Sequence, residues 1–483
     1  YVMKKQWTIA ICLLLISILV RFPYYFVDVI NWDESTFILM GQSLLDGHLP
    51  YTELWDLKPP LAFVAYALFI VLLGKSIVAI RLAGTLCVFL TSWFVYLIGK
   101  YLGNSSAGIF AGIMTIFTVT AIDSGQATMT EHVACVLLLG ALAWLITHKM
   151  TPGMLFLGGI LLTGATLVRL NLAYVVVGVG IWLLYSKFKH HKVEFRGIVA
   201  YCLGSFGLIL ITYLPYLIVG GSSIWLNSVV LTPLSYASHA SSAGQMETGK
   251  QLLAACLIYW ILNQVWQTNS SKLQQEFSLL QVFLFSTVIS IIRGGELYEH
   301  YCIQIFPLLA LTLALFWTRL PKISRLLIVT LVALGLLATV QPIYTQYQVL
   351  GDRLNAGKPL NHGVAYEIAD YLQQNNAEQK PVYMMQDQLV YWLSDLQPLS
   401  KVVTHPSNLS RDYLFKYIEG AAVSTEAELS KILAQKPKFI VRGGEDTPYI
   451  EDHPAAHLLL EQVLTTEYKL AKKIGDREIY QIR

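Results

Sequence analysis

Long apolar runs are the feature that most constrains how this chain can fold. They follow one another from the N-terminus to about residue 347, and a helix needs about 20 mostly apolar residues to cross the hydrocarbon core of a bilayer. In lipid, only helices and closed barrels satisfy all of their own backbone hydrogen bonds. About eleven runs are long enough for spanning helices, near 7–27, 77–100, 104–122, 130–148, 153–168, 171–186, 197–219, 250–267, 276–292, 301–318 and 324–344. The sequence therefore predicts a polytopic α-helical membrane protein.

Composition excludes several other classes. Only 13% of the 483 residues are charged, against about 25% in soluble domains, so membrane lipids are its expected surroundings. A formal net charge of +3 is too small to indicate a nucleic-acid partner. The six cysteines lie in or beside apolar runs and show no zinc or redox spacing. No small-residue cleavage site follows the first apolar run, which we expect to remain as a membrane helix.

Basic residues predict the orientation of the chain. They occur in every second connection between the apolar runs, which marks those connections as cytoplasmic: Lys4 and Lys5, Lys100, His148 and Lys149, 187–196, Lys272, and Arg319 with Lys322 and Arg325. The run 61–73 has only about 13 residues, too few to span, and counting it as a span would place 187–196 outside. We interpret it as an interfacial helix. The prediction is a multi-pass protein of the cell (inner or plasma) membrane with a cytoplasmic N-terminus.

The composition changes after Tyr347 to that of a soluble domain. We predict a membrane domain at 1–347, with a first outer loop at 28–76, and a soluble extracytoplasmic domain at 348–483. The latter shows helical patterns at 363–374 and 426–434 and strand patterns at 381–385, 438–442 and 478–482. Helices that alternate with short strands indicate a small α/β domain.

The first outer loop carries two groups of acidic residues. Asp33 and Glu34 follow Trp32, and Asp56 follows Trp55 two positions before Lys58. A carboxylate beside tryptophan at a membrane surface is partly desolvated, which raises its proton affinity and suits it to act as a base. The alternative is a solvated loop with interfacial aromatic residues, and the spacing alone leaves both open.

Further polar residues lie at the same predicted face. Asp123 and Glu131 flank a very short outer connection. His132 could be a base or a metal ligand, although a lone histidine is more often structural. Arg169 and Asn171 lie between two apolar runs, and an arginine at that depth indicates an anion site, or else a side chain that extends to the lipid headgroups.

A late helix entrance completes the set of candidates. Arg293, Tyr298, His300 and Tyr301 lie there, and Gly294-Gly295 allows close approach of the backbone to a ligand. Carboxylates for base chemistry and cations for a phosphate then occur within reach of lipid tails. This combination favours group transfer from a lipid phosphate.

In these residues the sequence resembles the GT-C membrane glycosyltransferases, in particular the lipid A aminoarabinose transferases and the protein O-mannosyltransferases. The layout is similar over the whole membrane part, and the specific residues are concentrated in 31–60 and 293–307. Matching positions are the acidic pair Asp33-Glu34, Asp56 with Lys58-Pro59, and His300-Tyr301 followed by Pro307.

The resemblance implies inverting transfer of a sugar from a polyprenyl-phosphate donor to an acceptor hydroxyl on the extracytoplasmic face. Asp33 would be the general base, with Glu34 or Asp56 orienting the acceptor. The other implied roles are donor phosphate binding by Lys58, Arg169, Arg293, His300 and Tyr301, and acceptor binding or support by Asp123, Glu131, His132 and Tyr298. The acceptor would be lipid-linked, a glycan or a protein. The chain lacks the lumenal β-domain of eukaryotic mannosyltransferases and has slightly fewer helices than the aminoarabinose group, so neither group's acceptor carries over.

Two questions stay open at this point. Acids near a phosphate could hold Mg²⁺ or Mn²⁺, although the resemblance implies no metal and we assign no metal ligand. A transporter or flippase of lipid-linked sugars would also place ionisable residues in a membrane pathway. Transporters often show inverted repeats and midplane binding residues, whereas these candidates lie at helix ends on one face. A membrane-anchored scaffold would leave the clustered acids and arginines without a role.

Overall fold

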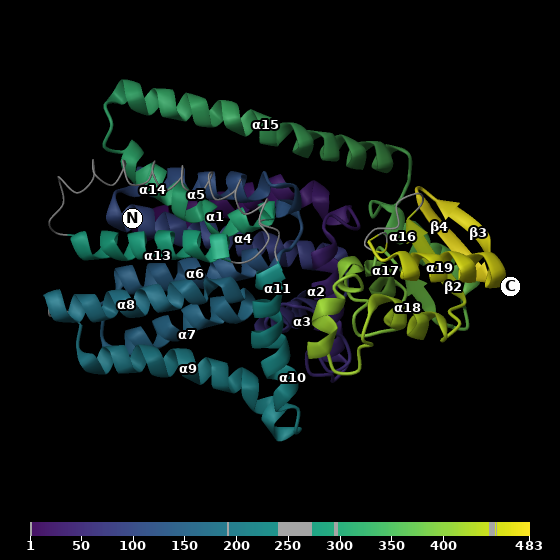
Figure 1. Ribbon diagram of the computed structural model, residues 1–483. Helices are drawn as coiled ribbons and strands as arrows, with labels where there is room; N and C mark the ends of the chain where they lie inside the picture. The colour runs from purple at the N-terminus through teal and green to yellow at the C-terminus, as the bar shows by residue number, and fades with distance from the viewer. Residues whose placement is uncertain (1, 191–192, 240–272, 294–297, 444–449, 451) are drawn as a thin grey trace. The chain divides into compact units, whose positions relative to one another are not determined.

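The computed structural model describes residues 2–190, 193–239, 273–293, 298–443, 450 and 452–483 (Figure 1). Its contacts divide the chain into two compact units. The first unit consists of Tyr1–Tyr24, Arg81–Thr212 and Ala237–Asp352, and the second of Tyr25–Ile80, Tyr213–Tyr236 and Arg353–Arg483.

The first unit is a helix bundle. In it α6 packs against α7, α5 against α14, and α8 against α13, and several of these helices run side by side (Figure 1). Its helices are α1 (Val2–Arg21), α4 (Ile77–Leu102), α5 (Ser105–Thr120), α6 (Thr130–Thr147), α7 (Pro152–Val168), α8 (Ala173–His190), α9 (Phe195–Ile218), α13 (Gln274–Arg293), α14 (Phe306–Trp317) and α15 (Lys322–Asn355), with short 3-10 turns η2 (Asp123–Gln126), η3 (Leu170–Leu172) and η5 (Glu299–Gln304).

The predicted membrane spans correspond to these helices. In the described part of the chain, seven helices are long and apolar enough to cross a bilayer. Three shorter apolar helices, Ser105–Thr120, Pro152–Val168 and Phe306–Trp317, lie where three further spans are predicted. The predicted span near 250–267 is outside the described residues. The polytopic α-helical fold is confirmed.

Glycines allow close helix packing where larger residues would clash. A Cβ on Gly159 of α7 would overlap the carbonyl oxygen of Tyr201 on α9, and one on Gly204 would overlap that of Phe156. Small residues at helix crossings are typical of membrane bundles, because apolar lipid gives no hydrophobic drive for helix association and close packing replaces it.

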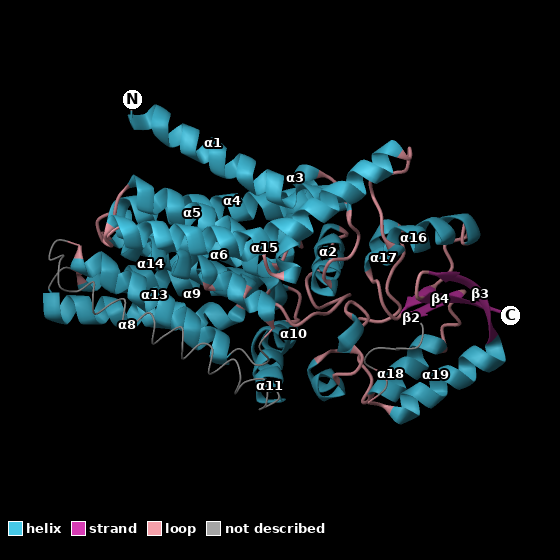
Figure 2. Ribbon diagram, turned by 90° about the horizontal axis from the view of Figure 1, so that it is seen from above, coloured by secondary structure: helices cyan, strands magenta, loops and turns pink. Residues whose placement is uncertain are grey.

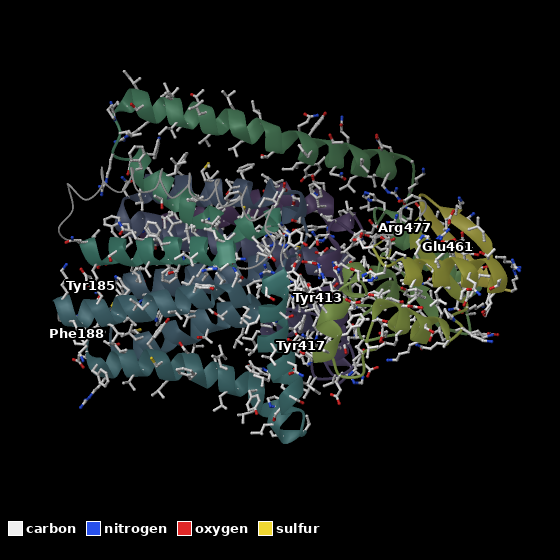
Figure 3. All side chains as sticks on the ribbon, viewed as in Figure 1. Tyr185, Phe188, Tyr413, Tyr417, Glu461 and Arg477 are labelled. Carbon is white, nitrogen blue, oxygen red and sulfur yellow. The ribbon has the colours of Figure 1, made fainter. Side chains whose placement is uncertain are left out.

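Aromatic and basic residues gather at one end of α8. Figure 3 shows Tyr185 and Phe188 there, both exposed. The Lys187 ammonium lies 4.4 Å from the ring centroid of Phe195, which begins α9. Exposed aromatic rings with basic neighbours are typical of a membrane–water interface.

The second unit combines short helices with a sheet. The four strands have the order β1-β2-β4-β3, with β1 and β2 parallel and the other pairs antiparallel (Figure 2). Its elements are η1 (Phe22–Phe26, shared with the first unit), α2 (Trp32–Leu45), α3 (Pro60–Leu73), α10 (Ser222–Leu226), a π-helical turn η4 (Asn227–Leu231), α11 (Thr232–His239), α16 (Val364–Asn375), β1 (Val382–Met384), α17 (Leu389–Leu393), η6 (Pro406–Asn408), η7 (Asp412–Tyr417), α18 (Thr425–Leu433), β2 (Phe439–Gly443), α19 (Pro454–Glu467), β3 (Tyr468–Ile474) and β4 (Arg477–Ile482).

The small α/β domain is confirmed, and ion pairs fasten its sheet. Arg442 of β2 pairs with Glu461 of α19 and with Glu478 of β4, and Figure 3 labels Glu461 at this sheet. Burial raises the pKa of Glu478, but hydrogen bonds from Lys473, Tyr480 and Arg442 lower it more, so the net pKa lies below its ordinary value. The charged form of Glu478 is therefore stabilised by folding.

The first outer loop belongs to the same compact unit as the C-terminal segment. The backbone N–H of Asp28 donates to the carbonyl of His362 at 3.0 Å, and its carboxylate accepts from the N–H of Ala365 at 2.7 Å, at the start of α16. Gly363 has a φ of +127°, and a Cβ there would overlap the Asp28 carboxylate, so the position favours glycine. The domain boundary at 347/348 stays a prediction.

Candidate active site

Asp33 and Glu34 occupy the first turn of α2. Asn31 caps this helix, because its side-chain oxygen accepts a hydrogen bond from the backbone N–H of Asp33 at 2.9 Å. Glu34 is only 2% exposed, whereas the side chain of Asp33 is 22% exposed. Of the two acids, Asp33 therefore has the more accessible side chain.

Two nitrogen groups lie beside the Asp33 carboxylate. Lys58 Nζ is 3.8 Å from Oδ2, and His405 Nε2 is 3.2 Å from Oδ1. We call Asp33, Lys58 and His405 the carboxylate cluster. The sequence led us to expect Lys58 at the donor phosphate, and the structure places its ammonium beside this carboxylate.

Asp56 forms the turn that leads to Lys58. Its Oδ2 accepts a hydrogen bond from the backbone N–H of Lys58 at 3.2 Å, which is the geometry of an Asx turn. The phenol of Tyr51 donates to the Lys58 carbonyl at 2.7 Å. Burial, with smaller effects from Tyr216 and Asp56, raises the pKa of Tyr51 well above its ordinary value, so the phenol stays protonated and can donate.

A second group of polar residues lies within the first unit. Arg169, at the C-cap of α7, forms an ion pair of 2.8 Å between Nη2 and Oε1 of Glu131 in the first turn of α6. His300 Nε2 is 3.7 Å from the same oxygen, and the Arg169 guanidinium lies 4.6 Å from the ring centroid of Tyr301. All four side chains are buried. We call them the arginine cluster.

Neighbouring groups hold the arginine cluster in place. The Asn171 amide donates to Gln304 at 2.9 Å and to Ser290 at 3.1 Å, which joins η3 to η5 and α13. Tyr298 is partly exposed and stacks on His300 with a centroid distance of 5.5 Å. These contacts fix the position of η3, which directly follows the buried Arg169, and that of η5, which carries His300 and Tyr301.

The remaining predicted site residues are Arg293, Asp123 and His132. Arg293 is exposed at the last turn of α13, and the residues that follow it, 294–297, are outside the described part. Asp123 begins η2, and its side chain is not described. His132 is buried, and its Nδ1 accepts from the backbone N–H of Met129 at 3.1 Å, which gives this nitrogen a local structural role.

No metal site is evident among the residues that the structure describes, since none of them form a group of three or more His, Cys, Asp or Glu that could hold an ion. The first acid, Asp33, has a lysine and a histidine nearby rather than a set of oxygen ligands of the kind that Mg²⁺ prefers.

Two residues with structural contacts at these sites, His405 and Arg21, were not among the candidates predicted from the sequence. His405 lies in the C-terminal segment, far from Asp33 in sequence, and its only signal is a histidine within the polar stretch 404–411. Arg21 is buried, and its guanidinium donates to the carbonyls of Gln126 at 3.0 Å and Ala127 at 3.1 Å. It thus fixes the connection that precedes Glu131. In the sequence, Arg21 is visible only as a lone arginine at the end of the first apolar run.

Comparison with solved structures shows the same architecture elsewhere. ArnT from Cupriavidus metallidurans bound to undecaprenyl phosphate aligns over 99% of this chain and 97% of that chain, with a TM-score of 0.61 and 12% identity. Its apo form aligns over 99% and 98%, with a TM-score of 0.62 and 11% identity. The archaeal oligosaccharyltransferase AglB from Archaeoglobus fulgidus, in complex with an inhibitory peptide and a dolichol-phosphate, covers 91% of this chain and 69% of its own, with a TM-score of 0.54 and 10% identity.

Sequence comparison gives a partial match. Residues 57–218 match the family model described as dolichyl-phosphate-mannose-protein mannosyltransferase. A comparison with curated protein sequences gives no match. The chain therefore has the polytopic GT-C fold of these membrane glycosyltransferases, and it resembles the group that includes ArnT and the protein mannosyltransferases.

Proposed function

We propose that this chain is an inverting glycosyltransferase that moves a sugar from a polyprenyl-phosphate donor to an acceptor hydroxyl on the extracytoplasmic face, with Asp33 as general base. One observation carries the proposal: a partly exposed carboxylate lies at a helix start, next to Lys58 and His405. It occurs in a fold shared with an ArnT that was solved with undecaprenyl phosphate. The acceptor is a lipid-linked, glycan or protein hydroxyl.

In the proposed reaction, Asp33 takes the proton of the acceptor hydroxyl as its oxygen attacks the anomeric carbon. The bond from that carbon to the phosphate oxygen breaks on the opposite face, and its electron pair leaves with the polyprenyl phosphate. The attack from the opposite face inverts the anomeric centre. A positioned general base typically contributes about 10²–10⁴-fold in rate.

The arginine cluster is the proposed site for the donor phosphate. An arginine buried among membrane helices is costly and by default marks a functional site, and a guanidinium can bind a phosphate through two parallel hydrogen bonds. Glu131 balances the charge of Arg169, and His300 and Tyr301 supply further polar groups. Cations aimed at a leaving phosphate stabilise the charge that develops in the transition state. Arg293 is exposed, so we assign it a smaller part.

The test is sugar transfer by the purified protein in liposomes, with a radiolabelled polyprenyl-phosphate sugar and membrane extract as the source of acceptor. We expect label in acceptor from the wild type, and a fall of about 10²–10⁴-fold for Asp33→Asn. Asp46→Asn is the matched control, since Asp46 is an exposed residue just after the other end of α2. NMR of the product would report the anomeric configuration. Movement of the labelled lipid across the bilayer without transfer would contradict the proposal and favour a flippase.

A further inference from the structure

We infer that His405 is a positioning residue for the Asp33 carboxylate, so that the C-terminal segment supplies part of the catalytic machinery. This inference rests on the proposed function, in which Asp33 is the base. It gives the C-terminal segment a role in the reaction, in addition to any role in binding an acceptor.

The hydrogen bonds of His405 fix which nitrogen carries its proton. The backbone N–H of Ser407 donates to Nδ1 at 3.1 Å, and the Ser407 hydroxyl lies 2.7 Å from the same nitrogen. A backbone N–H can only donate, so Nδ1 must be the acceptor, and in a neutral imidazole the proton is then on Nε2. This proton-bearing nitrogen is the one 3.2 Å from Oδ1 of Asp33.

Buried hydrogen bonds hold the segment that carries His405. The hydroxyl of Thr36 in α2 donates to the Thr404 carbonyl at 2.8 Å. The hydroxyl of Thr404 donates to the Trp55 carbonyl at 2.5 Å, and the backbone N–H of Trp55 donates to the Lys401 carbonyl at 3.0 Å. Thr404, Thr36 and Trp55 are almost completely buried. The histidine is therefore fastened to the helix that carries Asp33 and to the loop that carries Lys58.

The consequence is a carboxylate with a fixed orientation. A carboxylate at the start of a helix can otherwise rotate about its side-chain torsions, whose terminal torsion is broad. A donor beside Oδ1 restricts this rotation, and Lys58 lies on the side of Oδ2. Small displacements of a reacting group from its productive geometry lower rates strongly, so loss of His405 should slow the chemical step.

Three substitutions of His405 test the inference. His405→Gln keeps an N–H donor near the position of Nε2, whereas the amide of His405→Asn ends near the position of Nδ1, and His405→Ala removes both. We expect kcat to fall about 10–100-fold in the Ala and Asn variants, as is typical when a reacting group is displaced from its productive geometry, and the Gln variant to recover most of it. The KM for the lipid donor should change little in all three.

The control is His453→Ala, which removes a histidine from the same segment whose Nε2 lies 3.0 Å from a backbone carbonyl, that of Ser410. It should keep wild-type kcat. Thermal unfolding identifies variants that fail to fold. If the Ala variant fails to fold, the comparison of the Gln variant with the Asn variant tests the inference, because both keep a polar side chain.

The two proposals fail in different ways. Equal kcat in the wild type and in the Ala and Asn variants, or equal loss in the Gln and Asn variants, would overturn the role of His405 and leave the glycosyltransferase function intact. A donor KM that rises while kcat stays constant would also overturn it. No transfer by the wild type, or full activity of Asp33→Asn, would remove the proposed base and this inference with it.

Discussion

Replacing Arg169 by methionine should destabilise the protein strongly, because the substitution leaves the Glu131 carboxylate without its cation. The Glu131 side chain has no exposed surface, and the ion pair between the two side chains is 2.8 Å long. Removing one partner of a buried ion pair typically costs about 3–5 kcal/mol, since an uncompensated charge remains in a medium that solvates it poorly. The lost contact of the guanidinium with the Tyr301 ring adds about 1 kcal/mol to this loss of stability.

The double variant Glu131→Gln with Arg169→Met should recover most of this loss. It buries no charge at these positions, and removing both charges of a buried ion pair costs much less than removing one. Glu131→Gln alone should be destabilised, because the guanidinium then loses the ion pair with the Glu131 carboxylate. The four proteins form a double-mutant cycle, in which a coupling energy of about 2 kcal/mol or more is expected for groups in direct contact.

Denaturant-induced unfolding in detergent measures the four free energies. Arg196→Met is the matched control, because Arg196 is exposed near the start of α9, and such a surface change is expected to stay within about 0.5 kcal/mol. A double variant as unstable as Arg169→Met, or a single variant as stable as the control, would refute the electrostatic account of this pair.

The same variants separate stability from donor binding. The double variant should be stable yet bind the lipid donor poorly, since the proposed phosphate ligand is gone. Arg169→Lys keeps the charge but loses the planar fork, so it should need more donor for half-maximal rate and turn over more slowly. Arg293→Lys should change less, because Arg293 is exposed. Unchanged donor kinetics in Arg169→Lys would indicate a side chain that serves structure alone.

Three further predictions concern topology, pH and backbone strain. A cysteine introduced at Val423, which is 92% exposed, should react with an impermeant thiol reagent on intact cells. A cysteine at Lys189 should not react, because the basic loop around Lys189 is expected to be cytoplasmic. The opposite labelling pattern would reverse the predicted orientation. Folding lowers the pKa of Glu478, so its charged form stabilises the protein at pH values above the ordinary pKa of 4.5, and this stability is lost as the pH falls through the folded-state pKa. Glu478→Gln should therefore show a smaller fall of Tm on acidification, and an equal fall would contradict this. Gly363→Ala should lower the free energy of unfolding by about 1–3 kcal/mol, as measured by thermal unfolding. The loss should exceed that of Gly420→Ala, where φ is also positive but no atom lies near the added Cβ. Equal losses would rule out a clash between the new Cβ and the Asp28 carboxylate.

The membrane helices could be predicted because bilayer thickness imposes a length that is visible in one sequence. The helix Val364–Asn375 and the strand Phe439–Gly443 were also visible, because each buries a regular set of apolar residues. The strand Tyr468–Ile474 was not predicted. It lies at the sheet edge, and only its two end residues are buried, so it has no alternating pattern to detect. Exposed lysines of this kind are common on edge strands.

The candidate site could be predicted only in part. Asp33 was visible because its short motif lies within one loop, and Arg169 because an arginine between apolar runs is unusual. Their partners are set by tertiary contacts. His405 comes from a segment far along the chain, and the proximity of Lys58 to Asp33 depends on the turn that Asp56 makes. Periodicity and composition carry no information about such long-range contacts.

The energetics of the arginine cluster are consistent with the proposed role in phosphate binding. A buried ion pair is weak evidence for stability, because a well-packed apolar pair of similar volume often serves as well or better. Here Glu131 and Arg169 lie together at helix ends, with His300 near the same carboxylate oxygen. The pair holds a buried guanidinium in a fixed position, with its charge balanced by Glu131. A phosphate that gains negative charge as its sugar departs would then compete with Glu131 for that guanidinium, and the interaction would strengthen as the reaction proceeds. Interactions that are stronger in the transition state than in the ground state are those that accelerate a reaction, and the proposed phosphate site would give this buried pair a role that stability alone does not require.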